Sequence, residues 1–170
     1  MAPPEGPVRQ HDPMEVALRQ LGRRARTVQE VRTHLKGRGF EAEAVAEVLA
    51  KLSSLGYLDD RLFAARYAAW SAESRPMGRR RLGMELAHRG VSRETIDSVL
   101  DETYGPEQES EALQKALRKA LRTIGGERRR VTAFLLRRGF RPAQVMAAIE
   151  SCEELKESPW GSRDPGDLDT

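Results

Sequence analysis

The chain has 170 residues, of which 39% are hydrophobic, 32% charged and 5% aromatic, and its formal net charge is +3. This length fits one sizeable domain or several small ones, and the scarcity of aromatic residues and β-branched runs favours helix throughout. No run approaches the roughly 18 apolar residues of a membrane span and no signal-peptide pattern opens the sequence, so we expect a cytoplasmic protein without a membrane segment.

The N-terminal segment is predicted to be disordered. Residues 1–13, MAPPEGPVRQHDP, contain four prolines before any periodic apolar pattern begins. Such a segment cannot bury enough apolar surface to offset the entropy lost when it is ordered.

Residues 14–58 are predicted to form a first repeat of three helices. Its first helix is an apolar, helix-prone stretch, and Thr27-Val28-Gln29-Glu30 has the residue types of a capping box at the start of the second. Gly39 suits a position with positive φ, where the second helix ends and the turn to the third begins. The apolar residues that define the two helical stripes are Val31, Leu35, Phe40, Val45 and Leu49.

Residues 59–105 are predicted to form a second repeat with the same spacing around Gly90. The joint Gly56-Tyr57-Leu58-Asp59-Asp60 precedes it, and Asp59 or Asp60 is expected to cap its first helix. Ser92 is the expected N-cap of its third helix. The apolar residues equivalent to those of the first repeat are Leu82, Leu86, Val91, Ile96 and Leu100.

Residues 106–152 are predicted to form a third repeat around Gly139, after the joint Tyr104-Gly105-Pro106. Pro142 suits the first turn of its third helix. The equivalent apolar residues are Val131, Leu135, Phe140, Val145 and Ile149. A pattern that recurs about every 50 residues is typical of helical arrays. We therefore predict an all-α protein of three tandem, helix-turn-helix-like repeats that stack into an elongated, curved array.

The C-terminal segment 153–170 is predicted to be flexible. Its last part, SPWGSRDPGDLDT, is rich in proline, glycine and aspartate and has no periodic apolar face. The role of Trp160 in this segment stays open.

Charge is segregated by helix, although the net charge is small. The stretch from Arg23 to Arg38 carries six basic residues and one acidic residue, and the stretches Arg75–Arg89 and Gly126–Arg138 each carry five and one. The third helices are acidic instead. The candidate contact residues in the basic stretches are Arg23, Arg24, Arg26, Arg75, Arg79, Arg80, Arg81, Arg128, Arg129, Arg130, Arg137 and Arg138.

This segregation bears on the kind of partner. In a helix-turn-helix protein that reads DNA sequence, the third helix enters the major groove, where acidic side chains such as Glu43, Glu94 and Asp97 would face phosphates. Base-specific reading is therefore disfavoured. Dense arginine suits backbone phosphate or an acidic protein surface. A solvated helix face without a partner is the alternative for each single cluster.

The segment GYLDDRLFAARY, from Gly56 to Tyr67, followed by RPMGRRRLGMELAHRGVSRETIDSVL, resembles the signature of the RecX family of regulatory proteins. The first repeat and the third, with LLRRGF, are similar to the family's N-terminal and C-terminal repeats. The resemblance covers nearly all of Met14 to Cys152. The residues that match and are expected to be structural are Gly56, Tyr57, Leu58, Asp59, Asp60, Phe63, Gly78, Leu82, Glu85, Leu86 and Gly90.

The resemblance implies a cytoplasmic bacterial modulator of the RecA recombinase, in most cases an inhibitor, with roles in homologous recombination, DNA repair and the SOS response. Family members consist of tandem three-helix repeats and bind RecA filaments on DNA in the filament groove, and some bind single- or double-stranded DNA alone. We expect a monomer whose arginine clusters contact DNA or an acidic surface of RecA.

An enzyme is the least favoured class. His11, His34 and His88 lack the spacing of a metal site, and Gly125-Gly126 lacks the Gly-Lys-Ser/Thr of a phosphate-binding loop. The single cysteine, Cys152, has no evident partner base. We expect no catalytic residue, metal or cofactor. Two other classes stay open: a DNA-binding protein that acts without RecA, and a scaffold that binds only protein.

Overall fold

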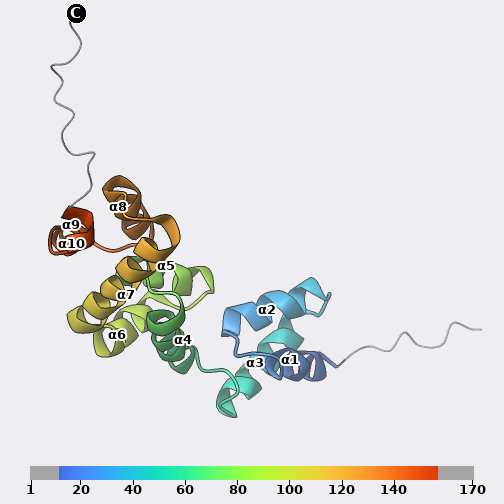
Figure 1. The fold of residues 1–170 in the computed structure, drawn as a ribbon. Coiled ribbons are helices and arrows are strands. Elements are labelled where there is room, and N and C mark those ends of the chain that lie inside the picture. The colour runs from blue at the N-terminus through green and yellow to red at the C-terminus, as the bar shows by residue number, and fades with distance from the viewer. Residues whose placement is uncertain (1–11, 157–170) are drawn as a thin grey trace, which may run out of the picture. The chain divides into compact units, whose positions relative to one another are not determined.

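A computed structural model of the chain describes residues 12–156, and within this range it contains ten helices and no strand (Figure 1). The prediction of an all-α protein with three tandem three-helix repeats is confirmed. The helices are α1 (Pro13–Leu21), α2 (Val28–Gly37) and α3 (Ala42–Ser54), α4 (Asp60–Ser74), α5 (Arg79–His88) and α6 (Arg93–Thr103), α7 (Pro106–Ile124), α8 (Arg128–Arg137) and α9 (Pro142–Glu150), and the short α10 (Glu153–Lys156).

The described residues form two compact units. Unit 1 comprises residues 12–66 and 86–98, and unit 2 comprises residues 67–85 and 99–156. Unit 1 therefore contains the whole first repeat, and unit 2 contains the whole third repeat. The three helices of the second repeat, α4, α5 and α6, each contribute residues to both units.

The three anchor glycines adopt the predicted conformation. Gly39, Gly90 and Gly139 have φ values of +85°, +85° and +82°, a region that glycine reaches without a steric penalty. The apolar positions that define the repeat are buried in all three copies, apart from Phe40, which is partly buried. The buried set is Val31, Leu35, Val45, Leu49, Leu82, Leu86, Val91, Ile96, Leu100, Val131, Leu135, Phe140, Val145 and Ile149.

The predicted helix starts are also confirmed. The Thr27 hydroxyl accepts from the Glu30 amide (3.1 Å), which completes the capping box of α2. The Ser92 hydroxyl accepts from the Thr95 amide (3.2 Å) ahead of α6. Asp59 caps α4 by accepting from the Leu62 amide (2.8 Å). Pro142 lies in the first turn of α9.

Consecutive repeats meet through the same joint. In unit 1 the Thr27 hydroxyl at the start of α2 donates to the Arg89 carbonyl after α5 (2.6 Å). In unit 2 the Gly78 amide at the start of α5 donates to the Arg138 carbonyl after α8 (2.8 Å). The start of each second helix therefore faces the end of the second helix of the next repeat. The positive end of one helix dipole lies against the negative end of another, which is favourable.

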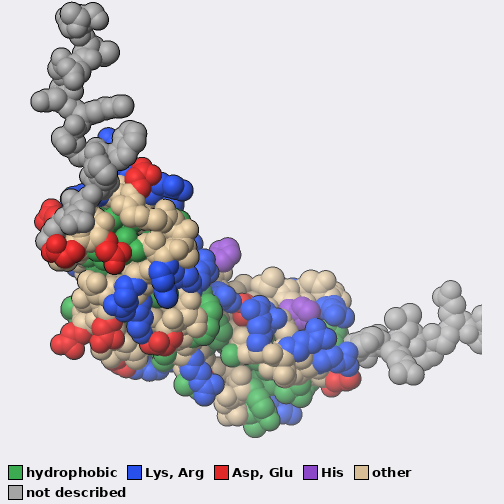
Figure 2. Space-filling view, viewed as in Figure 1, with side chains coloured by type: hydrophobic (Ala, Val, Ile, Leu, Met, Phe, Trp, Pro, Cys, Tyr) green, Lys and Arg blue, Asp and Glu red, His purple; other side chains and the backbone are tan. Residues whose placement is uncertain are grey.

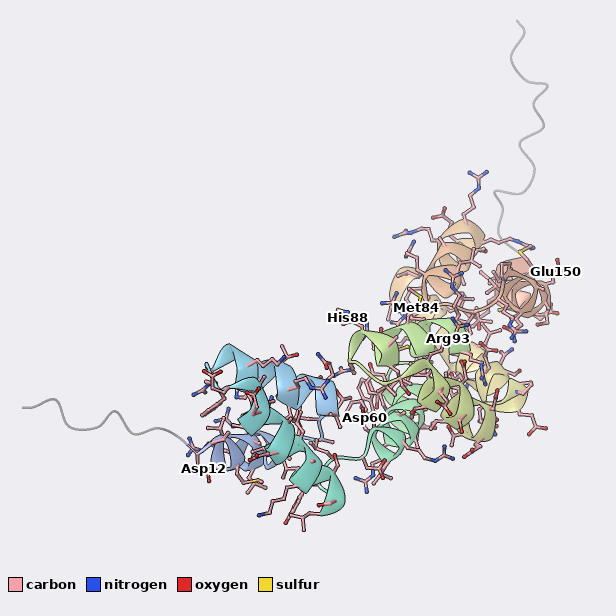
Figure 3. The ribbon with its side chains drawn as sticks, turned by 180° about the vertical axis from the view of Figure 1, so that it is seen from behind. Asp12, Asp60, Met84, His88, Arg93 and Glu150 are labelled. Atoms are coloured by element: carbon pink, nitrogen blue, oxygen red, sulfur yellow. The ribbon has the colours of Figure 1, made fainter. Side chains whose placement is uncertain are left out.

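A carboxylate of the following repeat completes each joint. Asp60 at the start of α4 accepts from the Val28 amide (2.9 Å). Figure 3 labels Asp60 at the start of α4. Glu109 in α7 accepts from the Arg79 amide (2.7 Å) and is almost fully buried. Burial raises the pKa of the Asp60 carboxyl by more than the hydrogen bond from Val28 lowers it, so this pKa lies above its usual value.

Three features differ from the sequence-based expectations. Tyr57, expected to be structural, is 60% exposed, because it follows α3 at a turn while the next residue, Leu58, takes the buried position. Pro13 already belongs to α1, with Asp12 as its cap. Helix α10 covers Glu153–Lys156 and buries Leu155, where a flexible segment was predicted. Residues 1–11 and 157–170, including Trp160, lie outside the described part of the chain.

Candidate anion-binding surface

The three consecutive arginines Arg79, Arg80 and Arg81 at the start of α5 point in different directions. Successive residues on an α-helix are turned by about 100°, so three in a row do not share a face. Arg80 is exposed, whereas Arg79 and Arg81 lie against other parts of unit 2. The run therefore does not act as one patch.

Arg79, one of the candidate contact residues, is engaged within the protein. Its guanidinium donates to the carbonyls of Leu100 (2.6 Å) and Tyr104 (3.3 Å) and to the Asp101 carboxylate (2.7 Å). These carbonyls belong to the last turn of α6 and the residue after it, and the Leu100 oxygen also accepts from the Tyr104 amide (3.0 Å). Arg79 therefore caps α6.

Three of the other candidate arginines are brought together around Glu85, on α5. The Arg81 Nε donates to Glu85 Oε1 (3.2 Å), and the Arg75 guanidinium lies 3.7 Å from Oε2. The Tyr67 hydroxyl also donates to Oε2 (2.6 Å). Arg138 lies close enough for Arg75 and Arg81 to affect its pKa. We call Arg75, Arg81, Arg138 and Glu85 the Glu85 cluster.

The Glu85 cluster holds more positive than negative charge. Burial alone raises the pKa of Glu85, but the Tyr67 hydroxyl, Arg75 and Arg81 together lower it by more, so its pKa lies below the usual value. Burial, followed by Arg75 and Arg81, lowers the pKa of Arg138. Its Nη1 is buried without a hydrogen-bond partner among the described residues. Three guanidinium groups around one carboxylate can accept a further anion.

Replacing Glu85 with glutamine is expected to lower the free energy of unfolding by about 1–3 kcal/mol near neutral pH, because Arg75 and Arg81 lose the carboxylate with which they pair. The folded-state pKa of Glu85 is depressed, so its stabilisation is complete above the unfolded-state pKa and is lost as pH falls through the folded-state pKa. Urea unfolding at neutral and at acidic pH should show a difference between Glu85→Gln and the unmodified protein that shrinks in acid.

Glu94→Gln is the matched control, because Glu94 is exposed on α6. Its free energy of unfolding should stay within about 0.5 kcal/mol of the unmodified protein. A difference for Glu85→Gln that does not vary with pH would contradict the ionised state assigned to Glu85.

The remaining candidate arginines divide into exposed and paired ones. Arg26 lies 3.9 Å from Glu30 and is largely covered, so it contributes to the joint in unit 1. Arg130 lies 3.8 Å from Glu127 at the start of α8 but is exposed. The residues whose side chains are exposed and have no ion pair among the described residues are Arg23, Arg24, Arg80, Arg128, Arg129 and Arg137.

A second group of cations was missed by the sequence reasoning. Lys115, Arg118, Lys119 and Arg122 line a cavity on α7. Their spacing of three, four and seven residues could have revealed a basic helix face, but α7 was considered only for its apolar stripe. Figure 2 shows Lys and Arg side chains gathered over the part of unit 2 where Figure 1 draws α7.

Among residues 12–156, no helix is long and apolar enough to cross a membrane. The same residues contain no group of three or more His, Cys, Asp or Glu side chains arranged to hold a metal ion.

Comparison with known proteins gives consistent matches along the chain. Three family models match in order: "RecX, first three-helix domain" over residues 14–52, the second domain over 59–100 and the third over 107–149. Regulatory protein RecX of Chlorobaculum tepidum is 33% identical over 131 residues, which cover 75% of this chain and 79% of the relative. The same protein of Chlorobium phaeobacteroides is 32% identical, covering 80% of this chain and 90% of the relative.

Solved structures support the same fold. The crystal structure of RecX from Lactobacillus salivarius superimposes with a TM-score of 0.70 over 85% of this chain and 94% of that chain, at 19% sequence identity. At this identity the likeness concerns the fold alone.

Proposed function

The chain belongs to the RecX family, and on this premise we propose that it binds RecA in the groove of the RecA–DNA filament and inhibits its recombinase and coprotease activities. The three family models, which match the chain from residue 14 to residue 149 in the order of the repeats, carry the proposal. We further propose a cytoplasmic monomer with repeats at 14–58, 59–105 and 106–152, and a regulator without catalytic residues or cofactor.

The excess of positive charge in the Glu85 cluster supports an acidic binding partner. The Arg81 guanidinium donates to the Arg137 carbonyl and Arg138 is partly buried, whereas Arg75 and Arg80 are exposed and contribute little to the fold. Arg75 reaches Glu85 only at 3.7 Å, and Arg80 has no ion pair among the described residues. A filament groove presents DNA phosphate next to protein carboxylates. Arginine can form bidentate hydrogen bonds with both groups. We propose that Arg75 and Arg80 make such contacts.

The double substitution Arg75→Ala/Arg80→Ala tests this proposal. We expect the concentration needed for half-inhibition of the DNA-dependent ATPase of RecA to rise about ten-fold, which corresponds to about 1.4 kcal/mol of binding free energy. Strand exchange and RecA-stimulated repressor cleavage should be relieved in parallel. Stability should change little, because exposed ion pairs contribute at most about 1 kcal/mol.

Lys51→Ala/Arg66→Ala is the matched control, since it removes the same charge from exposed positions on α3 and α4. It should inhibit as the unmodified protein does. If the unmodified protein left all three RecA activities untouched at stoichiometric concentration, the inhibitor proposal would fail. Binding to bare DNA that exceeds binding to filament would instead favour a DNA-binding protein that acts without RecA.

A further inference from the structure

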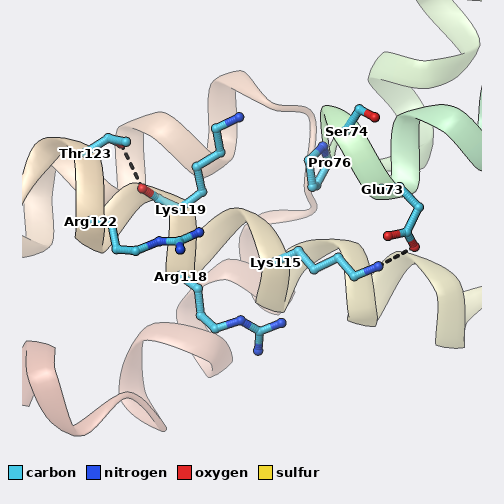
Figure 4. Close-up of a pocket in the computed structure, with 8 residues that line it drawn as sticks. All are labelled: Glu73, Ser74, Pro76, Lys115, Arg118, Lys119, Arg122 and Thr123. Atoms are coloured by element: carbon cyan, nitrogen blue, oxygen red, sulfur yellow. Dashed lines mark hydrogen bonds and ion pairs between the residues drawn. The ribbon is translucent and has the colours of Figure 1, made fainter.

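A cavity of about 430 Å³ lies in unit 2 between α7 and the residues at the end of α4. Four cations of α7 line one side, and Glu73, Ser74 and Pro76 line the other. Figure 4 shows Glu73 and Lys115 joined by an ion pair at one end of the cavity. Sites for small molecules in proteins have volumes of about 300–1,000 Å³. This cavity, which we call the α7 cavity, therefore has the size of a small-ligand site.

The α7 cavity carries an excess of positive charge. Glu73 is the only acidic residue in the lining, and it pairs with Lys115 (2.5 Å). The other three cations of the lining are Arg118, Lys119 and Arg122. Within the range 12–156, their side chains have no hydrogen bond or ion pair with another residue. Such neighbouring cations repel one another, and a bound anion would relieve that repulsion.

The packing of α7 holds these three cations close together. Residues 118–122 rise by only about 6 Å along the helix axis. The opposite face of α7 is buried in unit 2 and consists of Leu113, Ala116, Leu117 and Ala120. Because a packed helix carries the cations, binding of an anion requires little ordering of the backbone, and affinity is not lost to that cost.

The lining is suited to phosphate groups more than to other parts of a ligand. Arginine binds phosphate through two parallel hydrogen bonds, and lysine binds it as a point charge. The Ser74 hydroxyl can donate a further hydrogen bond. Pro76 is the only apolar residue in the lining, and no aromatic side chain is present on which a base could stack. A ligand of this cavity is therefore recognised through its phosphates.

The charge of the lining indicates a small polyphosphate and not a longer chain. A terminal phosphate carries about −1.5 to −2 charges at pH 7, so a diphosphate or triphosphate brings about three or four negative charges into a small volume. Each phosphate of a nucleic-acid backbone carries only one charge. Four cations against one carboxylate leave an excess of three positive charges, which matches the small polyphosphate. Walls from both α4 and α7 also suit a compact ligand better than a duplex that extends beyond the cavity.

We propose that the α7 cavity is a binding site for a small polyphosphate, which is either a free diphosphate or triphosphate or the phosphate chain of a nucleotide. The inference goes beyond the proposed regulation of RecA. It concerns a small-molecule ligand and residues other than Arg75 and Arg80.

Isothermal titration calorimetry of the unmodified chain tests the ligand class, without RecA or DNA, at constant ionic strength and with a chelator of divalent cations. Diphosphate and triphosphate should bind at least about ten-fold more tightly than orthophosphate or sulfate, because they engage more cations at once. Two results would support the proposal and separate the sources: ATP that binds as tightly as triphosphate indicates a nucleotide, and triphosphate binding without ATP binding indicates free polyphosphate. Equal, weak binding of all these anions would overturn the proposal.

Arg118→Ala/Arg122→Ala tests the place of the site. It should weaken diphosphate binding by about ten-fold or more, because it removes both arginines of the lining. Lys51→Ala/Arg66→Ala is the matched control, since it removes the same charge from exposed positions on α3 and α4, and it should change the affinity by less than about two-fold. Circular dichroism checks that both variants are folded. Equal affinities of the two variants would contradict the assignment of the site to α7.

Glu73→Gln tests the same site in the opposite direction. It should strengthen diphosphate binding by about three-fold or more, because the lining loses its only carboxylate. Glu94→Gln, at an exposed position on α6, makes the same change of charge and should leave the affinity unchanged. This pair decides the proposal even if Arg118→Ala/Arg122→Ala does not fold, and equal affinities within the pair would overturn it.

Nucleic acid as the occupant of the α7 cavity would also overturn the proposal. In that case Arg118→Ala/Arg122→Ala would weaken binding of a DNA duplex and leave diphosphate binding unchanged. RecA is absent from all of these titrations, so their results are independent of the proposed inhibition of RecA.

Discussion

Replacing Gly78 with alanine is expected to lower the free energy of unfolding by about 3 kcal/mol or more. A Cβ atom at Gly78 would lie 2.2 Å from the Gly139 carbonyl oxygen and 2.6 Å from the Phe140 nitrogen, and these backbone atoms cannot turn aside as a side chain could. Overpacking of this kind costs about 1–3 kcal/mol, and the hydrogen bond from Gly78 to the Arg138 carbonyl would be strained as well.

The surroundings of Gly78 leave little room for adjustment. The residue before it, Met77, is fully buried, and its carbonyl accepts from the Tyr104 hydroxyl (2.6 Å). The residue after it, Arg79, is held through its amide by Glu109 and through its guanidinium by α6. Urea unfolding measures the effect, and loss of the cooperative transition would be its extreme form.

Gly37→Ala is the control for this substitution. Gly37 is the last residue of α2, and a Cβ atom there would meet nothing within 4 Å. Alanine should leave stability unchanged or raise it by up to about 1 kcal/mol, because it favours helix over glycine. Equal effects of the two substitutions would show that α5 and the turn after α8 do not approach each other as closely as described.

Replacing Arg79 with alanine is expected to lower the free energy of unfolding by about 2 kcal/mol, the range for hydrogen bonds from a charged group. The loss removes the charged donor from the carbonyls of Leu100 and Tyr104, of which Leu100 keeps the hydrogen bond from the Tyr104 amide (3.0 Å). The contact with Asp101 adds little, because that carboxylate is mostly exposed to solvent. Urea unfolding at neutral pH measures the change.

Arg80→Ala provides the comparison at the adjacent position, with the same change of charge. Its side chain is exposed and has no ion pair among the described residues, so stability should stay within about 0.5 kcal/mol. When both variants are compared as folded protein, Arg80→Ala should weaken RecA inhibition more than Arg79→Ala does. Equal destabilisation by the two substitutions would contradict the capping role of Arg79.

The joints between repeats explain why contact residues and structural residues are mixed along the basic stretches. Each second helix starts at the carbonyl end of the second helix of the next repeat, so side chains near both ends are drawn into the contact. The side chains of Arg79 and Arg81 are held in this way, and the carbonyl of Arg138 accepts from Gly78, whereas Arg80 and Arg137 remain exposed. A run of like residues therefore gives no reliable guide to a binding surface.

The sequence by itself determined the helices, their repeat and most of their caps. The spacing of Leu35 and Leu49 around Gly39, repeated at Gly90 and Gly139, depends only on the helical period and on the freedom of glycine at positive φ. The same holds for Thr27 and Glu30, which lie within one turn of each other. These features involve residues close together in the chain, so a single sequence contains them.

The tertiary structure alone decided which cations are free to bind a partner. Asp60 and Glu109 cap helices that start 32 and 30 residues earlier in the chain, and Arg79 reaches carbonyls more than 20 residues away. The sequence also missed that Tyr57 is exposed and that four cations of α7 line a cavity. The direction of a long charged side chain depends on the packing of helices distant in sequence, and no local pattern specifies that packing.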